Sequence, residues 1–292
     1  MGSEFKRKRK SLDIMFRMRG NLKNWILIAL MISGFTACDH DDSPRPDPSQ
    51  EERPDELGSS DLIDNSDEFA YGATNGKIDF SGYQWDVKSS VTNAVGPGPN
   101  YFSMNRQNVW VDKKGSLHLE ITHRNDRWYS SSVSLPRPLG FGRYMIYVSS
   151  KTEDLDPNIV VGFFLYKSDT QEVDIELSRW AREDNKNAQF AIQPADRQGN
   201  KKRFDVLTEG YKTTYFIDWQ RDSIGFGGFK GASLNPKEEN IFSSWTYAGK
   251  DIPTDEEEKF IINFWLFRGN PPFNDQDAEI VIDSVRIIEY EK

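Results

Sequence analysis

Residues 171–180 read QEVDIELSRW, and apolar and acidic side chains alternate within this stretch. An extended backbone sends successive side chains to opposite faces. One face carries apolar side chains, those of Val173, Ile175 and Leu177. The opposite face carries three carboxyls, those of Glu172, Asp174 and Glu176. The stretch therefore predicts a strand with one buried face, and the three like charges on its other face need an explanation.

Similar alternation recurs from about Asp67 onward, in short runs of β-branched and aromatic residues broken by Gly, Asn, Asp and Pro. These runs lie at residues 115–123, 142–150, 158–166, 172–178, 187–194, 213–220, 259–267 and 278–290. Helical periodicity is scarce, and DIPTDEEEK (residues 251–259) predicts at most a turn or a short helix. Many short strands with frequent turn signals predict an all-β sandwich or jelly roll.

Three explanations compete for the acidic face. A solvated strand edge can carry alternating acids, and clustered carboxylates can bind Ca²⁺. The third explanation is catalysis, because retaining glycosidases need two carboxyls roughly 5–5.5 Å apart. The backbones of Glu172 and Glu176 lie about 13 Å apart on an extended strand, and long side chains can shorten that separation. Crowding would raise the pKa of some of the carboxyls, as a general acid near neutral pH requires.

The first 38 residues are typical of an export signal rather than of a folded domain. A basic region, residues 6–23, precedes an apolar run at residues 24–38 that is too short for a comfortable membrane span. FTAC, at residues 35–38, resembles a bacterial lipobox, in which Cys38 is lipidated and becomes the new N-terminus. An ordinary signal peptide and an uncleaved anchor are the alternatives. Cys38 is the one cysteine of the chain, which excludes disulfides within the chain and Cys-rich zinc sites.

Residues 39–66 are predicted to form an acidic tether rich in Pro and Ser, with too little apolar surface to order itself. The acids directly after Cys38 also resemble the surface-export signals of some Gram-negative lipoproteins. We therefore expect an exported, membrane-anchored lipoprotein at the outer membrane or cell surface. Loss of residues 1–38, which carry eight Lys or Arg and two acids, changes the formal charge from −9 to −15. Such an acidic domain repels phosphate, so no nucleic-acid partner is expected.

The segment EVDIE, residues 172–176, resembles the E-x-D-x-E signature of glycoside hydrolase family 16, whose members cut β-glucans and galactans. Other stretches resemble further blocks of that family in the same order, at residues 108–122, 139–148, 187–194, 211–226, 262–272 and 280–288. The resemblance implies a concanavalin A-like jelly roll for residues 67–292. Its two antiparallel sheets are expected to curve around a cleft, with the acidic strand on the concave face.

Carried over residue by residue, the resemblance implies that Glu172 is the nucleophile, Asp174 the assisting acid and Glu176 the general acid/base. The spacing E-x-D-x-E, without an inserted residue, is similar to the lichenase and xyloglucan-modifying branch of the family. That similarity favours a β-1,4 or mixed-linkage glucan as substrate. We expect no cofactor, and a structural Ca²⁺ is left open with no ligands assigned.

Sugar rings present flat C–H faces that stack on aromatic side chains, while polar groups fix their orientation. The candidates for stacking are Trp180, Trp219 and Trp265, each with core packing as its alternative. The polar candidates, in or beside the family blocks, are Asn108, Gln193 and Arg268. His118 and Glu120 share an outward face, where a solvated surface is favoured over a metal pair, so we predict no metal site.

Two classes of function remain. The first is a retaining, endo-acting glycosidase or transglycosylase, which acts on the O-glycosyl bonds of a β-linked polysaccharide such as a β-glucan or galactan. The second is a noncatalytic glycan-binding lipoprotein on the same fold. The intact acid triad favours the enzyme, because a pure binder has no reason to keep three adjacent carboxylates. The expected partners are a polysaccharide and, through the lipid anchor, a membrane, and the protein is expected to be a monomer.

Overall fold

The computed structural model describes residues 68–254 and 256–291. The predicted export signal, the tether and Cys38 lie outside them, so these remain predictions. The described residues form almost exclusively strands, turns and three short 3₁₀ turns, as the sequence predicts. None of the helical turns in this part is long and apolar enough to cross a bilayer.

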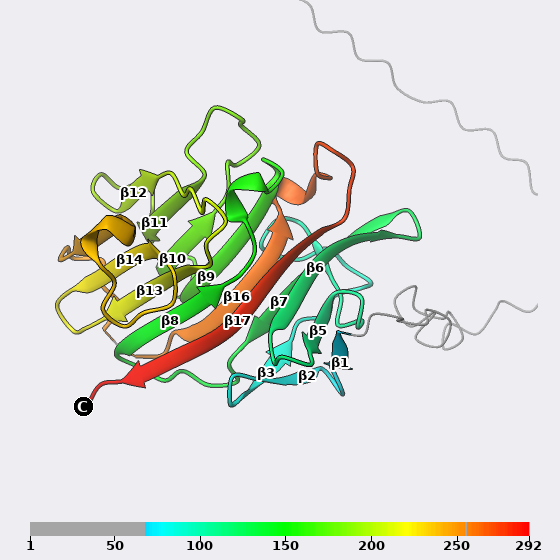
Figure 1. The fold of residues 1–292 in the computed structure, drawn as a ribbon, viewed down its shortest axis with the longest axis horizontal. Coiled ribbons are helices and arrows are strands. Elements are labelled where there is room, and N and C mark those ends of the chain that lie inside the picture. Colours follow the sequence, from blue (N-terminus) through cyan, green and yellow to red (C-terminus); the bar gives the residue numbers. More distant parts are fainter. Residues whose placement is uncertain (1–67, 255, 292) are drawn as a thin grey trace, which may run out of the picture. The chain divides into compact units, whose positions relative to one another are not determined.

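The described strands form two antiparallel sheets packed face to face (Figure 1). The first is called the outer sheet here, and strands β8, β17 and β6 run side by side through its middle. Its strands, in spatial order, are β1 (Phe69–Gly72), β5 (Val109–Asp112), β6 (Leu117–Arg124), β17 (Ala278–Glu289), β8 (Gly142–Val148), β13 (Thr213–Trp219), β14 (Ile224–Lys230) and β15 (Ile241–Tyr247).

The second sheet is called the cleft sheet. Its strands, in spatial order, are β2 (Lys77–Phe80), β3 (Tyr83–Val87), β7 (Arg127–Ser134), β16 (Lys259–Leu266), β9 (Ile159–Ser168), β10 (Gln171–Leu177), β11 (Ala188–Ile192) and β12 (Lys201–Phe204). The short β4 (Tyr101–Phe102) lies parallel to β7. The 3₁₀ turns are η1 (Thr152–Asp154), η2 (Glu238–Asn240) and η3 (Phe267–Gly269).

A hairpin joins the two sheets. The first part of β6, residues 117–121, pairs with β17 in the outer sheet. The last part, residues 122–124, pairs instead with β7. Strand β7 then continues into the cleft sheet, where residues 131–134 pair with β16. The two sheets are therefore one hydrogen-bonded network as well as two packed layers.

The core fills the space between the sheets. The alternation of the opening stretch is confirmed, because Val173, Ile175 and Leu177 are buried in that core. Burial of each such side chain contributes about 1.5–3 kcal/mol, which fixes the register of β10. Its acids are consequently directed to the face of the cleft sheet that points away from the core.

Several strands were not predicted from the sequence, above all β7. This strand reads RWYSSSVS, and its serines obscure the apolar alternation. Ser132 and Ser134 line the open face of the cleft sheet, whereas Val133 belongs to the core. The segment at residues 251–258 forms turns and irregular backbone wherever it is described, so the short helix considered for it is absent there.

Candidate active site

The three acids of the opening stretch lie on β10, between β9 and β11. Glu172 is paired with Tyr166 of β9, and Glu176 is paired with Gly162 of the same strand. On the other side, Glu176 is paired with Gln189 of β11. A strand paired on both sides is a rigid support, so the carboxyls are held in place before any ligand arrives.

Hydrogen bonds connect the acids to β11 and to one another. Gln189 Nε2 donates to Glu176 Oε2 at 2.5 Å, and Gln193 Nε2 donates to Asp174 Oδ2 at 3.0 Å. Asp174 also shares a hydrogen bond with Glu172. Two carboxyls can share such a bond only when one of them keeps its proton. Asp174 is buried, and we assign the proton to it, with Glu172 as the acceptor.

Burial raises the pKa of all three carboxyls, because desolvation disfavours their charged forms. The pKa of Glu172 rises to about 7, with repulsion from Glu176 adding to desolvation. The pKa of Asp174 rises well above its ordinary value for the same two reasons, with both Glu172 and Glu176 repelling it. At Glu176 the rise in pKa is opposed by the hydrogen bond from Gln189 and by the charge of Arg203. Near neutral pH the cluster therefore holds protons that its members share.

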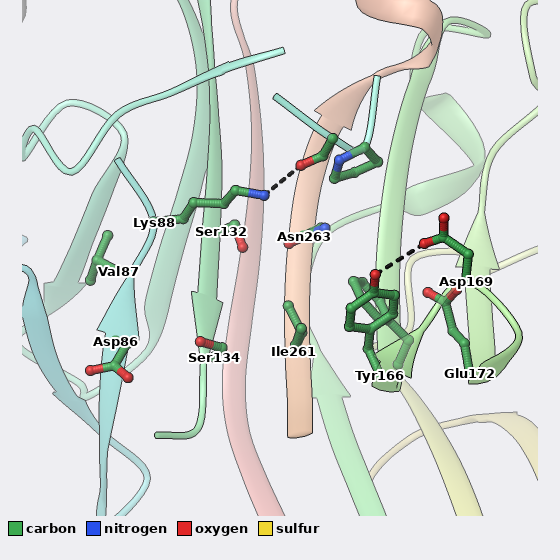
Figure 2. A pocket seen from close by; sticks show the side chains of 13 residues that line it. Asp86, Val87, Lys88, Ser132, Ser134, Tyr166, Asp169, Glu172, Ile261 and Asn263 are labelled. Atoms are coloured by element: carbon green, nitrogen blue, oxygen red, sulfur yellow. Dashed lines mark hydrogen bonds between the residues drawn. The ribbon is translucent and has the colours of Figure 1, made fainter. Parts of the chain in front are cut away.

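A cleft of about 500 Å³ opens on this face beside Glu172. Figure 2 shows Glu172 and Tyr166 on one side of it and Asp86 and Lys88 on the other, with side chains of β7 and β16 between them. Tyr166 donates to Asp169 Oδ1 at 3.0 Å, and Lys88 Nζ donates to the Gly96 carbonyl at 2.5 Å. Hydrogen bonds thus hold both walls, and the volume is within the range of ordinary ligand sites.

Asn263 is a cleft residue that sequence reasoning missed. It lies on β16 beside Gly162, one strand further from Glu176, and beside Ser132 of β7. Its Oδ1 is buried and accepts no hydrogen bond from any described residue. An unpaired buried acceptor costs about 1–3 kcal/mol, so Asn263 is well placed to receive a sugar hydroxyl. Its position in the block at residues 262–272 was the one signal in the sequence that pointed to it.

Four of the six residues predicted to bind sugar lie on or beside the open face of the cleft sheet. Trp265 is half-buried at the next outward position of β16 after Asn263. Gln193 contacts Asp174, so it supports the acids and is not free to bind a ligand with the same amide hydrogen. Trp180 and Arg268 line a second hollow.

The predictions for Trp219 and Asn108 are wrong, because both residues lie in the interior with no exposed surface. Trp219 packs edge-on against Phe141, and its indole Nε1 donates to the Pro253 carbonyl at 3.0 Å. Asn108 Nδ2 donates to the Glu120 carbonyl at 3.1 Å and thereby braces the start of β5. These two residues match the family blocks because of their packing role, and neither exposes an atom that a substrate could contact.

The solvated face predicted for His118 and Glu120 is wrong for His118, which is buried, and each of the two side chains has its own hydrogen-bond partner. His118 is buried, stacks on Trp110 with centroids 3.8 Å apart, and places its Nδ1 2.6 Å from Glu279 Oε1. Glu120 Oε1 instead accepts a hydrogen bond from Trp110 Nε1 at 2.7 Å. In the described residues no group of three or more His, Cys, Asp or Glu side chains is arranged to hold a metal ion.

Sequence comparison finds no family model and no curated protein that matches the chain. Structural comparison finds many similar folds. A β-glucanase of Bacillus licheniformis is 18% identical with a TM-score of 0.53, and the match covers 76% of this chain and 97% of that one. A glycosyl hydrolase family 16 protein of Mycobacterium smegmatis is 14% identical with a TM-score of 0.53, covering 74% and 94% of the two chains.

A third similar structure is described as an immunostimulatory antigen and pseudo β-1,3-glucanase of Mycobacterium tuberculosis. It is 16% identical with a TM-score of 0.54, and the match covers 74% of this chain and 92% of that one. These matches confirm the predicted fold: the chain has the jelly roll of the β-glucanases. At such identities the likeness establishes the fold alone, and the chemistry has to be argued from the site.

Proposed function

We propose that this protein, which has the β-glucanase jelly roll, is a glycoside hydrolase of family 16 that cleaves a β-linked polysaccharide, a β-glucan or a galactan, within the chain and with retention of configuration. The observation that carries the proposal is the row of three carboxyls with raised pKa on the open face of the cleft sheet, beside a cleft. Such a row is suited to a reaction that needs one carboxylate and one protonated carboxyl.

The mechanism has two displacements. In the first, a Glu172 oxygen attacks the anomeric carbon and forms a glycosyl ester, while Glu176 gives its proton to the departing glycosidic oxygen. In the second, Glu176 takes a proton from water, and the water oxygen attacks the anomeric carbon and releases Glu172. Asp174 donates its hydrogen bond to Glu172, which limits the charge on the row and orients the attacking oxygen.

A glycan-binding protein without activity is the alternative, and the pseudo-glucanase among the similar structures makes the fold alone insufficient to exclude it. The energetics of the row argue against it. At pH values above its raised pKa, a buried carboxyl lowers the free energy of unfolding by about 1.4 kcal/mol for each unit by which folding has raised that pKa. Binding of neutral sugars does not require carboxyls with a raised pKa, whereas general acid catalysis near neutral pH does.

The anomer of the first product tests the proposal. We expect proton NMR of a digest, recorded before mutarotation, to show the β-anomer at the new reducing end. Glu172→Gln should lower the turnover number by at least about 10³-fold, because no covalent ester can form, while polysaccharide binding is kept. Glu238→Gln, at an exposed position of η2 that does not line the cleft, is the matched carboxyl-to-amide control. An α-anomer, or Glu172→Gln with wild-type turnover, would overturn the assignment.

Glu176 is tested separately by chemical rescue. Glu176→Ala should retain ester formation on aryl glycosides whose leaving group needs no proton, and lose it on the polysaccharide. Added azide should then accelerate release and yield a β-glycosyl azide, since a small anion can attack without a general base. If azide has no effect and the polysaccharide is still cut, Glu176 is not the acid/base.

A further inference from the structure

A second hollow, of about 570 Å³, lies at one edge of the cleft sheet and is rich in arginine. Strands β10 and β16 run in the same direction, because each is antiparallel to β9. The segments that follow them therefore emerge at the same edge, and they bring Trp180 and Arg268 into one cavity. The other arginines that line it are Arg182 and Arg203, the latter near the end of β12.

This hollow adjoins the acidic row on the side of Glu176. Arg203 is paired with Gln189 of β11, and Gln189 is paired with Glu176 of β10. Phe204 packs into the core, so Arg203 is directed to the same open face as the acids. Two strand spacings of about 4.8 Å then separate the backbones of Arg203 and Glu176. A polysaccharide lying across the strands beside Glu176 would therefore pass close to Arg203.

Arg203 and Arg268 lie against aromatic rings, and neither forms an ion pair with a carboxylate in the described part of the chain. The Arg203 guanidinium lies 4.2 Å from the centroid of the Trp180 ring, and the Arg268 guanidinium lies 5.0 Å from that of Phe267. Over residues 68–254 and 256–291, neither guanidinium is within ion-pair distance of a carboxylate or donates a hydrogen bond. Stacking uses the face of a guanidinium and leaves its in-plane N–H groups available.

The third arginine is different, because it has its own counter-ion. Arg182 pairs with Asp184 at 3.0 Å, and both side chains are well exposed. Among the described residues, the hollow therefore offers two arginines without an ion-pair partner, in a chain whose formal charge is −9. Only some of the other basic side chains of the described part, among them Lys77, Arg143 and Lys212, are paired with carboxylates.

We propose that this hollow binds the anionic substituent of a charged polysaccharide, a sulfate ester or a carboxylate, on a sugar unit close to the bond that is cut. The inference rests on the proposed function and narrows its substrate class. Two planar guanidinium groups match the paired oxygens of sulfate and carboxylate, and charge-assisted hydrogen bonds are about twice as strong as neutral ones. Trp180 orients Arg203 for this contact.

The occupied hollow would also assist catalysis. The charge of Arg203 opposes the rise in the pKa of Glu176. An anion bound to Arg203 offsets that charge, so Glu176 keeps its proton to higher pH and remains a competent acid. We therefore expect the alkaline limb of the pH–rate profile to lie at higher pH for a charged substrate than for its neutral parent.

The test uses polysaccharides that differ only in charge. Barley β-glucan and agarose are each compared in neutral, partly sulfated and C6-carboxylated form. Binding is measured by calorimetry with the full chain carrying Glu172→Gln, so that the polymer stays intact, and cleavage is measured with the unmodified site. On one backbone we expect sulfated or carboxylated polymer to bind at least about tenfold more tightly than the neutral form. The form that binds more tightly, sulfated or carboxylated, shows which of the two anionic groups the hollow recognises.

Arginine variants connect that preference to the hollow. Arg203→Gln with Arg268→Gln should bring the affinities for the charged and neutral forms within about twofold of each other, with the larger loss for the charged form. Arg203→Lys should retain part of the preference, since charge is kept and the planar fork is lost. Arg286→Gln, which removes an exposed charge from the outer sheet, should leave the preference intact and serves as the matched control.

The two proposals fail in different ways. Cleavage of a neutral polymer with no preference for charged forms overturns the anion site and leaves the hydrolase standing. A preference that survives in the double arginine variant, or that Arg286→Gln also abolishes, likewise overturns it. If the wild-type chain neither binds nor cleaves any of these polymers, the proposed function fails and the anion site fails with it.

Discussion

Asp174 shows how burial, rather than residue type, sets chemical behaviour in the acidic row. It contacts Gln193 and Glu172, and its environment keeps a proton on it at pH values where an exposed aspartate is ionised. A neutral Asp174 accepts from Gln193 through one oxygen and donates to Glu172 through the other. An asparagine has the same acceptor and donor arrangement.

This pairing yields a prediction for two substitutions of one residue. Asp174→Asn should lower the turnover number by about tenfold or less, whereas Asp174→Ala should lower it by about 10²-fold, because Glu172 then loses a donor. In Asp174→Ala the pKa of Glu172 should rise, since that hydrogen bond lowers it. The acidic limb of the pH–rate profile should therefore move to higher pH in the alanine variant alone. Equal losses in both variants would show that the hydrogen bond has no such role.

The sequence predicts the acidic row correctly because side chains two residues apart on one strand always lie on the same face. The prediction failed for Trp219 because the face that a residue occupies depends on which side of its own strand meets the core. Trp219 alternates with Ile217 and Tyr215, all of which are buried. A tryptophan carries no local mark that distinguishes a stacking platform from a core residue, and Asn263 likewise sits unmarked among apolar neighbours.

At the scale of elements, β9 forms the floor beside the row, and a glycine shapes it. A Cβ on Gly162 would lie 3.1 Å from Cδ1 and Cε1 of Phe164, which is tighter than ordinary contact. The missing side chain lets the Phe164 ring lie against the strand while it lines the cleft. Gly162 is thus required for the depth of the cleft and not for backbone conformation.

We predict that Gly162→Val displaces the Phe164 ring into the cleft. Polysaccharide binding and turnover should each fall by about tenfold or more, while the far-UV circular dichroism spectrum stays that of the wild type. A valine is otherwise well suited to a strand, so the fold should tolerate it. Ser244→Leu, at an exposed position of β15, is the control for adding an apolar side chain to a sheet. Unchanged turnover in Gly162→Val would rule out this role for the glycine.

Strands could be predicted from the sequence where they carry several buried apolar side chains. Strands β8, β9, β10, β13 and β17 carry regular buried positions and were located from them. Strand β7 was missed because its outward side faces a cleft and is lined by small polar residues. The polar cleft-lining residues of β7 thus hide the apolar alternation that identifies a strand. Which strand pairs with β7 also cannot be read from its own sequence.

At the scale of the whole molecule, several raised carboxyl pKa values link stability to pH. Burial raises the pKa of Glu120 to about 7, as it does for Glu172. Between the ordinary carboxyl pKa and pH 7, the folded chain then binds more protons than the unfolded chain. Its free energy of unfolding therefore falls as pH rises through that interval. The raised pKa of His118 acts in the same direction.

We predict a melting temperature that is highest near pH 5 and declines toward pH 8. Glu120→Gln should raise stability at pH 8 by on the order of 1 kcal/mol and leave it unchanged near pH 4, because the amide cannot ionise and still accepts from Trp110. Calorimetric melting across this pH range measures the effect. The exposed Glu183→Gln is the control, and a melting temperature that increases between pH 5 and pH 8 would contradict the linkage.

We also propose that the chain is exported and anchored through lipid on Cys38, which lies outside the described residues. Cells expressing the full chain should carry it in the membrane fraction, and Cys38→Ser should release it or leave its signal uncleaved. Ser43→Ala, five residues further along, is the control for a change in the same region. Identical fractionation and processing of Cys38→Ser and the wild type would exclude lipidation.

The division of labour among strands has a consequence for how such proteins diversify. The three carboxyls of the proposed chemistry come from β10, whereas most residues that line the two hollows come from β3, β7, β9, β12, β16 and the segments that follow β3, β9, β10 and β16. Substitutions on the flanking strands can therefore change which sugar the cleft accepts, while the three carboxyls of β10 stay in place. The reaction and the substrate specificity are then set by different strands, so similarity to a protein of known substrate does not identify the polysaccharide that this chain accepts.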